Sequence, residues 1–164
     1  MHDELTRIDI QKMEAELEEH RREWPDLIAE VQRTRAFGDL SENYEYKAAK
    51  QEQNQCRRRM RYLENMIKTA RIIEDHSAAD EVGLYDKVEI YLPEDDETET
   101  VQIVTTVRCD ANHGFISKES PFGKSILGRK VGDRITVHVN DSYSYEAVIR
   151  SITKGEDDGS AALL

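Results

Sequence analysis

The chain has 164 residues and a net charge of −11, and charged residues make up 35% of it. This length suits one or two small domains, and the high charge predicts a large share of solvated helix surface. Because no run of 18 apolar residues occurs and the N-terminus carries no apolar stretch, we expect neither a membrane span nor a signal peptide. The isolated cysteines Cys56 and Cys109 fit a reducing cytoplasm and argue against a disulfide scaffold or a zinc site.

The charge is distributed unevenly along the chain. Residues 31–61 hold eight basic and four acidic side chains, whereas residues 1–30 and 62–164 carry net charges of −6 and −9. A strongly acidic protein is a poor general binder of nucleic acid. The basic zone therefore predicts a local contact with phosphate or with an acidic partner surface, although a solvated helix face with i,i+4 ion pairs would also explain it.

Two stripes, each about four heptads long, dominate the first half of the chain. Their positions alternate in steps of three and four residues, which is the spacing of a coiled-coil seam. One stripe precedes Gly38 and the other follows it, so we predict an antiparallel helical hairpin whose second helix covers roughly residues 41–74. Pro25 should bend the first helix or break it. The stripes consist of Ile10, Met13, Leu17, His20, Trp24, Leu27, Val31 and Thr34, and of Tyr46, Ala49, Gln53, Cys56, Met60, Leu63, Ile67 and Ala70.

The second half changes to short alternating runs, which predict a small, mostly antiparallel β region. A short helix should run from Ser120 to Leu127, with Ser120 as its N-cap and Pro121 as its first residue. Residues 76–80 indicate a linker, and the acidic tail at 155–164 should be frayed. The expected strands are residues 87–92, 100–107, 114–117, 134–139 and 145–152.

The turn between the two helices, Phe37-Gly38-Asp39-Leu40-Ser41-Glu42-Asn43, carries two acids at the end of the hairpin. Two interpretations stay open. Asp39 as N-cap and Glu42 three residues later would form a capping box. Alternatively, the two carboxylates are hard oxygen ligands suited to Mg²⁺. Two ligands hold Mg²⁺ poorly, so in that case they would complete a site supplied by another molecule.

No complete active site is evident in the sequence. The five histidines have no metal-ligand spacing, and the P-loop, G-x-S-x-G and G-x-G-x-x-G motifs do not occur. His20 and Cys56 fall on the seam, and we interpret both as core residues.

Two segments resemble the signatures of a known family. Residues 38–53, G-D-L-S-E-N-Y-E-Y-K-A-A-K-Q-E-Q, closely resemble a signature of the bacterial Gre transcript cleavage factors, GreA and GreB. Residues 120–133, S-P-F-G-K-S-I-L-G-R-K-V-G-D, resemble that family's second signature. The resemblance covers roughly residues 4–154, and the acidic composition resembles GreA more than GreB. Tyr44 departs from the pattern, because the family commonly has Ala there; an aromatic ring could stack on a nucleotide or merely cover the tip.

The resemblance implies an α+β protein with two domains. A coiled-coil hairpin would cover residues 1–76, with its tip at 36–44, and a linker would follow at 77–83. An FKBP-like domain at 84–154 would dock on RNA polymerase, and a flexible acidic tail would occupy 155–164.

The family's activity implies a role for the tip. The hairpin enters the secondary channel of RNA polymerase, and the tip acids, here Asp39 and Glu42, help to hold a second Mg²⁺ shared with the polymerase. The polymerase then hydrolyses backtracked nascent RNA near its 3′ end, which fits the need of two-metal chemistry for both cations. Ser41 would help to position the acids or the RNA.

The resemblance also implies partners and contact residues. We expect a cytoplasmic monomer that binds no Mg²⁺ by itself and is not itself an enzyme. Residues expected to contact nucleic acid are Arg33, Arg35, Lys47, Lys50, Arg57, Arg58 and Arg61. Residues expected to contact the polymerase are Ser120, Pro121, Phe122, Ile126, Leu127 and Gly128.

Two alternatives remain. The first is a Gre-like channel binder that inhibits or modulates the polymerase without cleavage; the intact Asp39 and Glu42 pair argues against it. The second is a prolyl isomerase, which only the implied fold suggests, since residues 84–154 offer few aromatic side chains for such a pocket.

Overall fold

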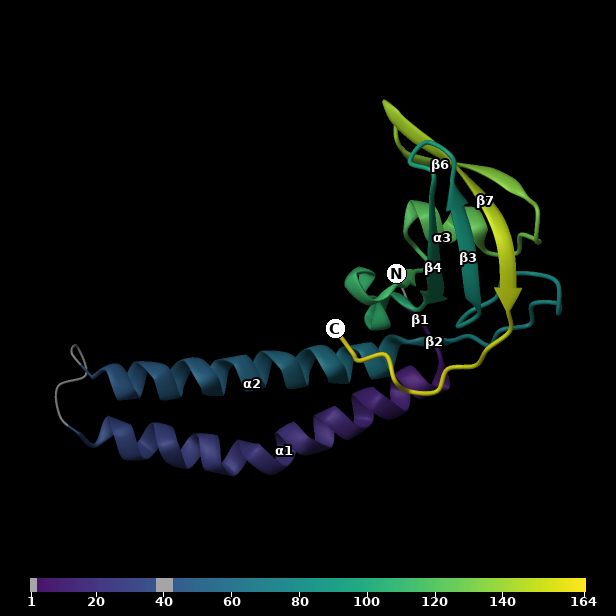
Figure 1. The fold of residues 1–164 in the computed structure, drawn as a ribbon. Helices are drawn as coiled ribbons and strands as arrows, with labels where there is room; N and C mark the ends of the chain where they lie inside the picture. The colour runs from purple at the N-terminus through teal and green to yellow at the C-terminus, as the bar shows by residue number, and fades with distance from the viewer. Residues whose placement is uncertain (1–2, 38–42) are drawn as a thin grey trace. The chain divides into compact units, whose positions relative to one another are not determined.

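A computed structural model describes residues 3–37 and 43–164 (Figure 1). The chain groups into two compact units: residues 1–3 with 10–71, here called the hairpin unit, and residues 4–9 with 72–164, here called the sheet unit. In chain order the elements are β1 (Glu4–Leu5), α1 (Arg7–Arg35), α2 (Tyr44–Thr69), β2 (Arg71–Ile72), β3 (Lys87–Leu92), β4 (Glu97–Val104), the short 3₁₀ helices η1 (Thr106–Arg108) and η2 (Ala111–His113), β5 (Phe115–Ser117), α3 (Pro121–Ile126), β6 (Arg134–Asn140) and β7 (Tyr143–Thr153).

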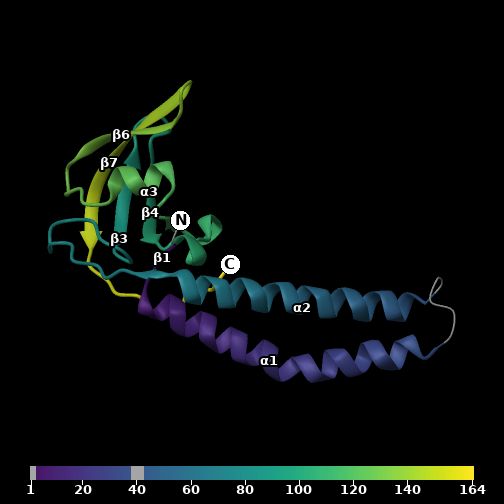
Figure 2. The same cartoon turned by 180° about the vertical axis from the view of Figure 1, so that it is seen from behind.

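The predicted antiparallel hairpin is confirmed: α1 and α2 run side by side in both views (Figures 1 and 2). Every position of the two stripes is buried or half-buried, and Met13, Leu17 and Leu63 are among the most buried. Contacts across the seam pair the helices in opposite directions, since Glu16 meets Arg59 whereas Thr34 meets Asn43. The heptad spacing therefore places the apolar side chains of both helices in one shared interface.

Pro25 lies inside α1, which continues through it as one helix from Arg7 to Arg35. Figure 1 shows that α1 bends in its middle without a break. A proline removes one backbone hydrogen bond and crowds the preceding turn, which bends a helix. Of the two outcomes expected for this residue, the bend is the one observed.

The second helix is shorter than predicted at both ends. It begins at Tyr44, because Asn43 is its N-cap and accepts a hydrogen bond from the Tyr46 amide at 2.9 Å. It ends at Thr69, since Ala70 has an extended backbone. The following amide of Ile73 donates to the Leu5 carbonyl at 2.9 Å, so strand pairing replaces the last predicted helical turn.

The sheet unit contains a five-stranded sheet in the order β5-β4-β3-β7-β6 among the described residues. Its pairs are antiparallel except for β4 with β5, so the prediction of a mostly antiparallel β region is confirmed. Alternating residues point to one face, as the period of two in a strand requires. They form a core with α3: Val88, Ile90, Val101, Ile103, Ile126, Ile135, Val137, Ala147 and Ile149, joined by Val82.

Two segments expected to be loose are packed. Val82, from the predicted linker at 77–83, is buried in the core and exchanges backbone hydrogen bonds with Gly128 and Arg129. In the tail at 155–164, Ala161 is buried and the Leu164 amide donates to the Val107 carbonyl at 2.8 Å. The prediction of a frayed tail is wrong, because small and acidic residues of the tail fill a buried polar site. Within the described residues, no helix combines the length and the apolar character that crossing a membrane requires.

Candidate functional site

The hairpin tip carries the acids predicted to act, and the structure describes its two edges. Asp39, Ser41 and Glu42 lie outside the described residues. On the far side of the tip, the Asn43 side chain accepts from the Tyr46 amide and donates to the Thr34 carbonyl at 2.6 Å. One amide group therefore caps α2 and ties its first turn to the last turn of α1.

The capping box predicted for Asp39 and Glu42 is wrong as a description of the α2 start. Asn43 holds the N-cap position, and asparagine is among the best residues for it because its oxygen reaches the free amides of the first turn. A reciprocal capping pair does occur at the start of α1, where the Thr6 hydroxyl accepts from the Asp9 amide and Asp9 accepts from the Thr6 amide.

The donor chemistry of the tip suits Mg²⁺. Asp39 and Glu42 supply carboxylate oxygens, the donors that Mg²⁺ prefers, and too few of them for a closed site. Within residues 3–37 and 43–164, no group of three or more His, Cys, Asp or Glu side chains could hold a metal ion. The pair thus fits a partial ligand set that another molecule would complete.

Two exposed aromatic rings stand at the edges of the tip, each beside a cation. The Phe37 ring is 57% exposed, and the guanidinium of Arg33 lies 5.1 Å from its centroid. The Tyr44 ring is 79% exposed, and Lys47 Nζ lies 5.5 Å from its centroid. Arg33 also makes a two-pronged ion pair with Glu30 at 2.6 and 2.9 Å, which raises the pKa of Arg33. A phosphate would have to compete with Glu30 for Arg33.

The structure brings three of the predicted nucleic-acid contacts together. Lys47, Lys50 and Arg58 line one groove on α2, of about 300 Å³, together with Tyr46, Gln51 and Asn54. None of the described residues that line it is acidic. The other four predicted contacts are apart from this groove: Arg33 pairs with Glu30, Arg57 lies over the Trp24 ring at 5.5 Å, and Arg35 and Arg61 are exposed elsewhere.

Arg59 has a structural role, since it binds Glu16 across the seam through two hydrogen bonds of 2.6 and 3.0 Å. These bonds hold the pKa of the Glu16 carboxyl below its usual value. His20 also faces Glu16 at 3.3 Å, and Cys56 Sγ lies 3.7 Å from the His20 ring. Burial raises the pKa of the Cys56 thiol, which suits the predicted role as a core residue.

The predicted polymerase contacts surround α3. Ser120 is the N-cap, as predicted, and its hydroxyl accepts from the Gly123 amide at 3.0 Å. A Cβ on Gly123 would lie 2.1 Å from the Ser117 carbonyl oxygen, so only glycine lets α3 approach the chain so closely. Pro121 and Gly128 are exposed, whereas Phe122 and Leu127 pack partly against the core.

Ile126 corrects the predicted set, because its side chain is fully buried in the core. Ile126 packs the short helix α3 against the core. A side chain buried in this way cannot contact a partner directly in this structure. Phe122 instead opens onto a cavity of about 270 Å³. Its walls are Leu92, Val101, Ile116, Phe122, Tyr143 and Tyr145, and its rim carries Glu94, Asp95, Glu99 and Glu146.

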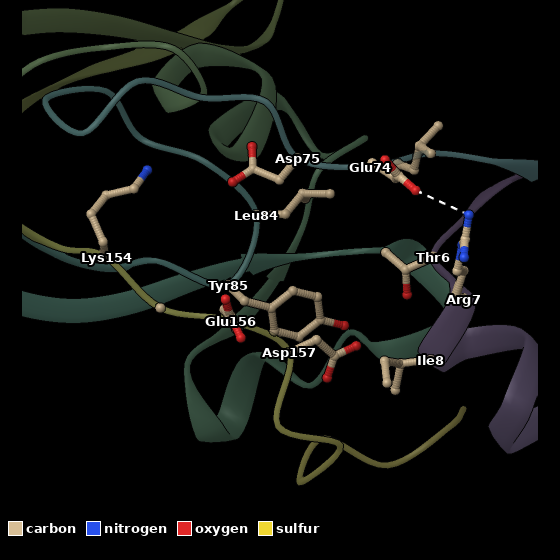
Figure 3. A pocket seen from close by; sticks show the side chains of 12 residues that line it. Thr6, Arg7, Ile8, Glu74, Asp75, Leu84, Tyr85, Lys154, Glu156 and Asp157 are labelled. Atoms are coloured by element: carbon tan, nitrogen blue, oxygen red, sulfur yellow. Dashed lines mark ion pairs between the residues drawn. The ribbon is translucent and has the colours of Figure 1, made fainter.

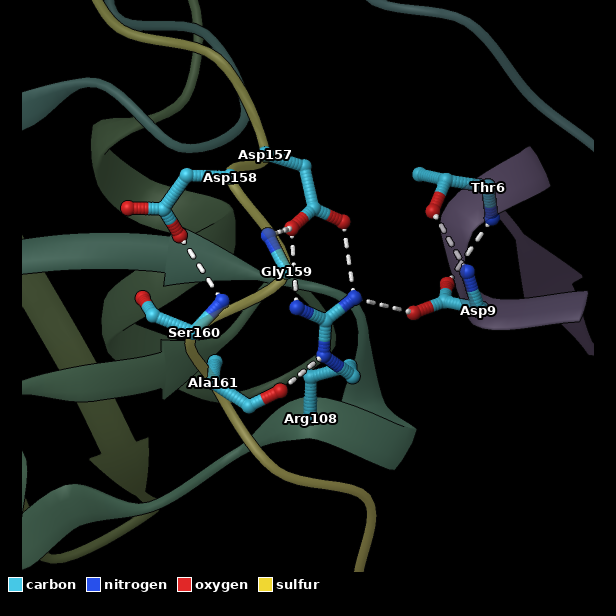
Figure 4. Close-up of polar contacts among 8 residues, drawn as sticks. All are labelled: Thr6, Asp9, Arg108, Asp157, Asp158, Gly159, Ser160 and Ala161. Carbon is cyan, nitrogen blue, oxygen red and sulfur yellow. Dashed lines mark hydrogen bonds and ion pairs between the residues drawn. The ribbon is translucent and has the colours of Figure 1, made fainter. Parts of the chain in front are cut away.

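A buried ionic cluster around Arg108 was not predicted. Figure 4 shows the Arg108 guanidinium between Asp157, Asp9 and the Ala161 carbonyl. It binds both oxygens of Asp157 at 2.7 and 2.8 Å, Asp9 at 3.1 Å and the Ala161 carbonyl oxygen at 2.5 Å. Arg108 and Asp9 have no exposed side-chain surface. The only sequence signal was an arginine inside an otherwise apolar and small-residue run, which does not identify its partners.

Beside this cluster lies a cavity of about 660 Å³ within the sheet unit (Figure 3). Its charged lining is largely paired, since Arg7 binds Glu74 at 3.3 Å and Lys154 binds Asp86 at 2.6 Å. The Tyr85 ring lines it, and the Tyr85 backbone is left-handed at φ 64°, which is strained for a bulky residue. Among the described residues that line it, no nucleophile lies beside a base.

Comparison with known proteins places both halves of the chain in one family. The family model described as transcription elongation factor, N-terminal, matches residues 4–72, and the model for the GreA/GreB C-terminal region matches residues 76–154. The transcription elongation factor GreA of Bacillus velezensis is 43% identical over 134 residues, covering 81% of this chain and 85% of the relative. That of Thermotoga maritima is 39% identical over 151 residues, covering 92% and 97%.

A solved structure, GreA factor homolog 1 of Thermus thermophilus, is 26% identical and covers 94% of this chain and 100% of that one. Its TM-score of 0.44 is too low to support an argument. The two matched regions and the sequence identity to the GreA relatives show the family without this structure. The chain belongs to the GreA/GreB family of transcription elongation factors.

Proposed function

We propose that this elongation factor inserts its hairpin into the secondary channel of RNA polymerase and stimulates cleavage of backtracked nascent RNA. The observation that carries the proposal is the position of the G-D-L-S-E-N segment, which directly joins α1 to α2 in a chain matched to the family over both regions. At 1.5 Å per residue the 26 residues of α2 span about 39 Å. A helical pair of that length can carry two acids into a narrow channel.

Each tip residue has a defined task in this proposal. The carboxylates of Asp39 and Glu42 bind Mg²⁺ together with ligands of the polymerase, and Ser41 helps to position them. When bound, Mg²⁺ supplies charge stabilisation and an activated water for phosphodiester hydrolysis. Asn43 holds the ends of the loop in place through its bonds to Tyr46 and Thr34. The factor therefore contributes ligands and orientation, and the polymerase contributes the reaction.

The sheet unit supplies a second contact in the proposal. The exposed surface of α3 at Pro121 and the neighbouring cavity beside Phe122 offer apolar anchoring surface bounded by carboxylates. Apolar pockets with a polar rim are the usual form of a protein–protein hot spot. A basic surface of the polymerase would be complementary in charge to this rim.

The test is RNA cleavage by a halted, backtracked polymerase complex with and without Mg²⁺, together with a binding measurement on the same complex. Asp39→Asn and Glu42→Gln should each lower the cleavage rate by roughly 10- to 100-fold or more, since even outer-shell groups of a metal site contribute that much. Binding to polymerase should remain nearly unchanged. Glu45→Gln, which removes an exposed acid from the first turn of α2, is the matched control and should leave cleavage intact.

Two outcomes would contradict the proposal. If the wild-type chain binds the polymerase and leaves backtracked RNA uncut, the factor is a channel binder without cleavage activity. If the Asp39 and Glu42 variants lose binding in proportion to cleavage, the acids act in docking or folding and not at the metal.

A further inference from the structure

Tyr44 has the most exposed large hydrophobic side chain among the described residues. It is the first residue of α2, and its ring is 79% exposed. Lys47 lies one turn further along the helix, with Nζ 5.5 Å from the ring centroid, a cation–π distance. The ring is therefore held by a cation while most of its surface remains open to a ligand.

The groove on α2 shares Lys47 with this ring contact and is lined by residues further along the helix. Lys47, Lys50 and Arg58 provide three positive charges, and the other described residues of the lining are neutral. In a protein with a net charge of −11, a groove with three cations and no acid among its described lining residues is a local departure that favours an anionic ligand. From Tyr44 to Arg58 the helix rises about 21 Å, which is long enough for several nucleotides of a single strand.

An open aromatic ring followed by a row of cations is the arrangement with which proteins bind single-stranded nucleic acid. Bases stack on the ring, because every base has a π face, and the cations follow the phosphates. An acidic peptide would also be attracted by the cations, but it would leave the large Tyr44 ring without a partner. A duplex would offer no unpaired base to the ring.

We propose that Tyr44 is a stacking residue for an unpaired nucleobase of single-stranded RNA, whose phosphates follow Lys47, Lys50 and Arg58. That this RNA is the extruded end of a nascent transcript rests on the proposed function. Binding of RNA by the chain itself does not depend on it.

The matched control is Tyr62, which lies 18 residues further along α2. Eighteen residues are five full turns, so Tyr62 is on the same face of the helix, beyond the groove. Its ring is 40% exposed, and the guanidinium of Arg59 lies 5.1 Å from its centroid. Because Arg59 is paired with Glu16 and the groove does not reach this position, Tyr62 has the ring and the cation without the phosphate path.

The experiment measures binding of a short single-stranded RNA with 2-aminopurine near its 3′ end to the full chain, by fluorescence quenching at several salt concentrations. Tyr44→Ala should weaken binding by roughly 5- to 100-fold, the loss typical of one base–aromatic stack. Tyr44→Phe should bind like wild type, and Tyr44→Leu should behave like Tyr44→Ala. Tyr62→Ala should have no effect.

Salt dependence separates stacking from charge. Lys50→Gln should reduce the slope of log K against log salt by about 0.7, whereas Tyr44→Ala should leave the slope unchanged. Polyglutamate and duplex RNA should not compete at equal charge concentration.

Several results would overturn the inference: no quenching with the wild-type chain at low salt, full binding by Tyr44→Ala or Tyr44→Leu, equal loss with Tyr62→Ala, or displacement by polyglutamate. These results are independent of the cleavage assay. A chain that stacks RNA through Tyr44 and does not stimulate cleavage would refute the proposed function alone. If the wild-type chain stimulates cleavage and the Tyr44→Ala variant binds RNA as tightly as wild type, only the stacking proposal is refuted.

Discussion

The hairpin unit and the sheet unit treat buried polarity in opposite ways. In the hairpin, the buried polar residues of the seam, Thr34 and Gln53, carry no charge. Ion pairs such as Glu16 with Arg59 lie at its edge, where each side chain keeps more than a quarter of its surface exposed. In the sheet unit, the full charges of Arg108 and Asp9 are completely buried. Burial of a charge costs free energy unless partners compensate for it.

The difference lies in how far apart the partners are in the sequence. The buried Thr34 hydroxyl donates to the carbonyls of Glu30 and Val31, one turn away. Arg108 is instead satisfied by Asp9, Asp157 and Ala161, which are 99, 49 and 53 residues away. The buried Thr34 hydroxyl is therefore satisfied within one helical turn, whereas the sheet unit must bring three distant segments together before its buried charge is compensated.

The largest expected effect follows from removing the central charge. Arg108→Met leaves Asp9 and Asp157 buried beside each other without a cation, which should lower the free energy of unfolding of the sheet unit by about 3–5 kcal/mol. Amide hydrogen exchange at β3, β4 and β7 would measure this loss. The seam should be much less affected, and Trp24, the only tryptophan, reports on it by fluorescence.

Arg150→Met is the control for this variant, because Arg150 is an exposed arginine of the same unit that lies over the Tyr91 ring at 4.3 Å. Arg150→Met should lower the free energy of unfolding much less than Arg108→Met does. If both variants lower the free energy of unfolding equally, or if the sheet amides of Arg108→Met exchange as slowly as in wild type, the buried cluster does not hold the three segments together. The contrast between the two units would then be unfounded.

The sequence predicts the hairpin well because its determinants are periodic. Steps of three and four residues identify the seam positions, and the structure buries them. The short helix was also predictable, since Ser120 and Pro121 are local signals for a helix start. The α2 start was misplaced because the segment offers two candidate caps. Asp39 with Glu42 matched a capping box, and the structure has Asn43 at the N-cap position.

The tail and the Arg108 cluster could not be predicted in the same way. An acidic, small-residue segment such as 155–164 is typical of a frayed end, and nothing in its own sequence reveals that Asp157 meets Arg108. At the site, sequence reasoning named Lys47, Lys50 and Arg58 separately, and only their shared face on α2 makes them a groove. Their contact with RNA stays a prediction, as does the metal role of Asp39 and Glu42.

A smaller effect is expected at the hairpin tip, where one side chain makes two bonds. Asn43→Ala removes both the cap of α2 and the bond to the Thr34 carbonyl, and should lower the free energy of unfolding of the hairpin by about 1–2 kcal/mol. Urea titration followed by Trp24 fluorescence measures this change. In the cleavage assay, the same variant should lower the rate without abolishing it, because the acids remain and only their support is lost.

Asn43→Asp separates the two bonds, since a carboxylate can accept from the Tyr46 amide and cannot donate to the Thr34 carbonyl. Stability should fall by less than in Asn43→Ala, while the cleavage rate should fall by a similar factor if the tie to α1 positions the loop. If Asn43→Asp cleaves like wild type, the cap alone supports the tip. That result would extend the turn-by-turn character of the hairpin to its functional end.

The smallest effect tests the edge of the seam by pH. Two hydrogen bonds from Arg59 hold the pKa of Glu16 below the usual 4.5. The pair therefore stabilises the hairpin above pH 4.5, and this contribution is lost as the pH falls through the lowered pKa. Arg59→Met should cost at most about 1 kcal/mol at neutral pH, because solvent screens a pair with this exposure. The difference from wild type should vanish once the pH lies well below the lowered pKa of Glu16.

Arg21→Met is the control, since the Arg21–Glu64 pair spans the same two helices at 3.2 Å with both side chains about half exposed, and it should change stability even less. The free energy of unfolding of wild type and both variants would be measured by urea titration at pH 5.5 and at a pH below the lowered pKa of Glu16. His20 faces Glu16 in all three proteins, so its contribution cancels in the comparison. A loss in Arg59→Met that persists unchanged at low pH would mean that the guanidinium acts by packing on Tyr62 and not by its charge. The edge of the seam would then depend on apolar contact, as its centre does, and buried charge would distinguish the sheet unit even more sharply.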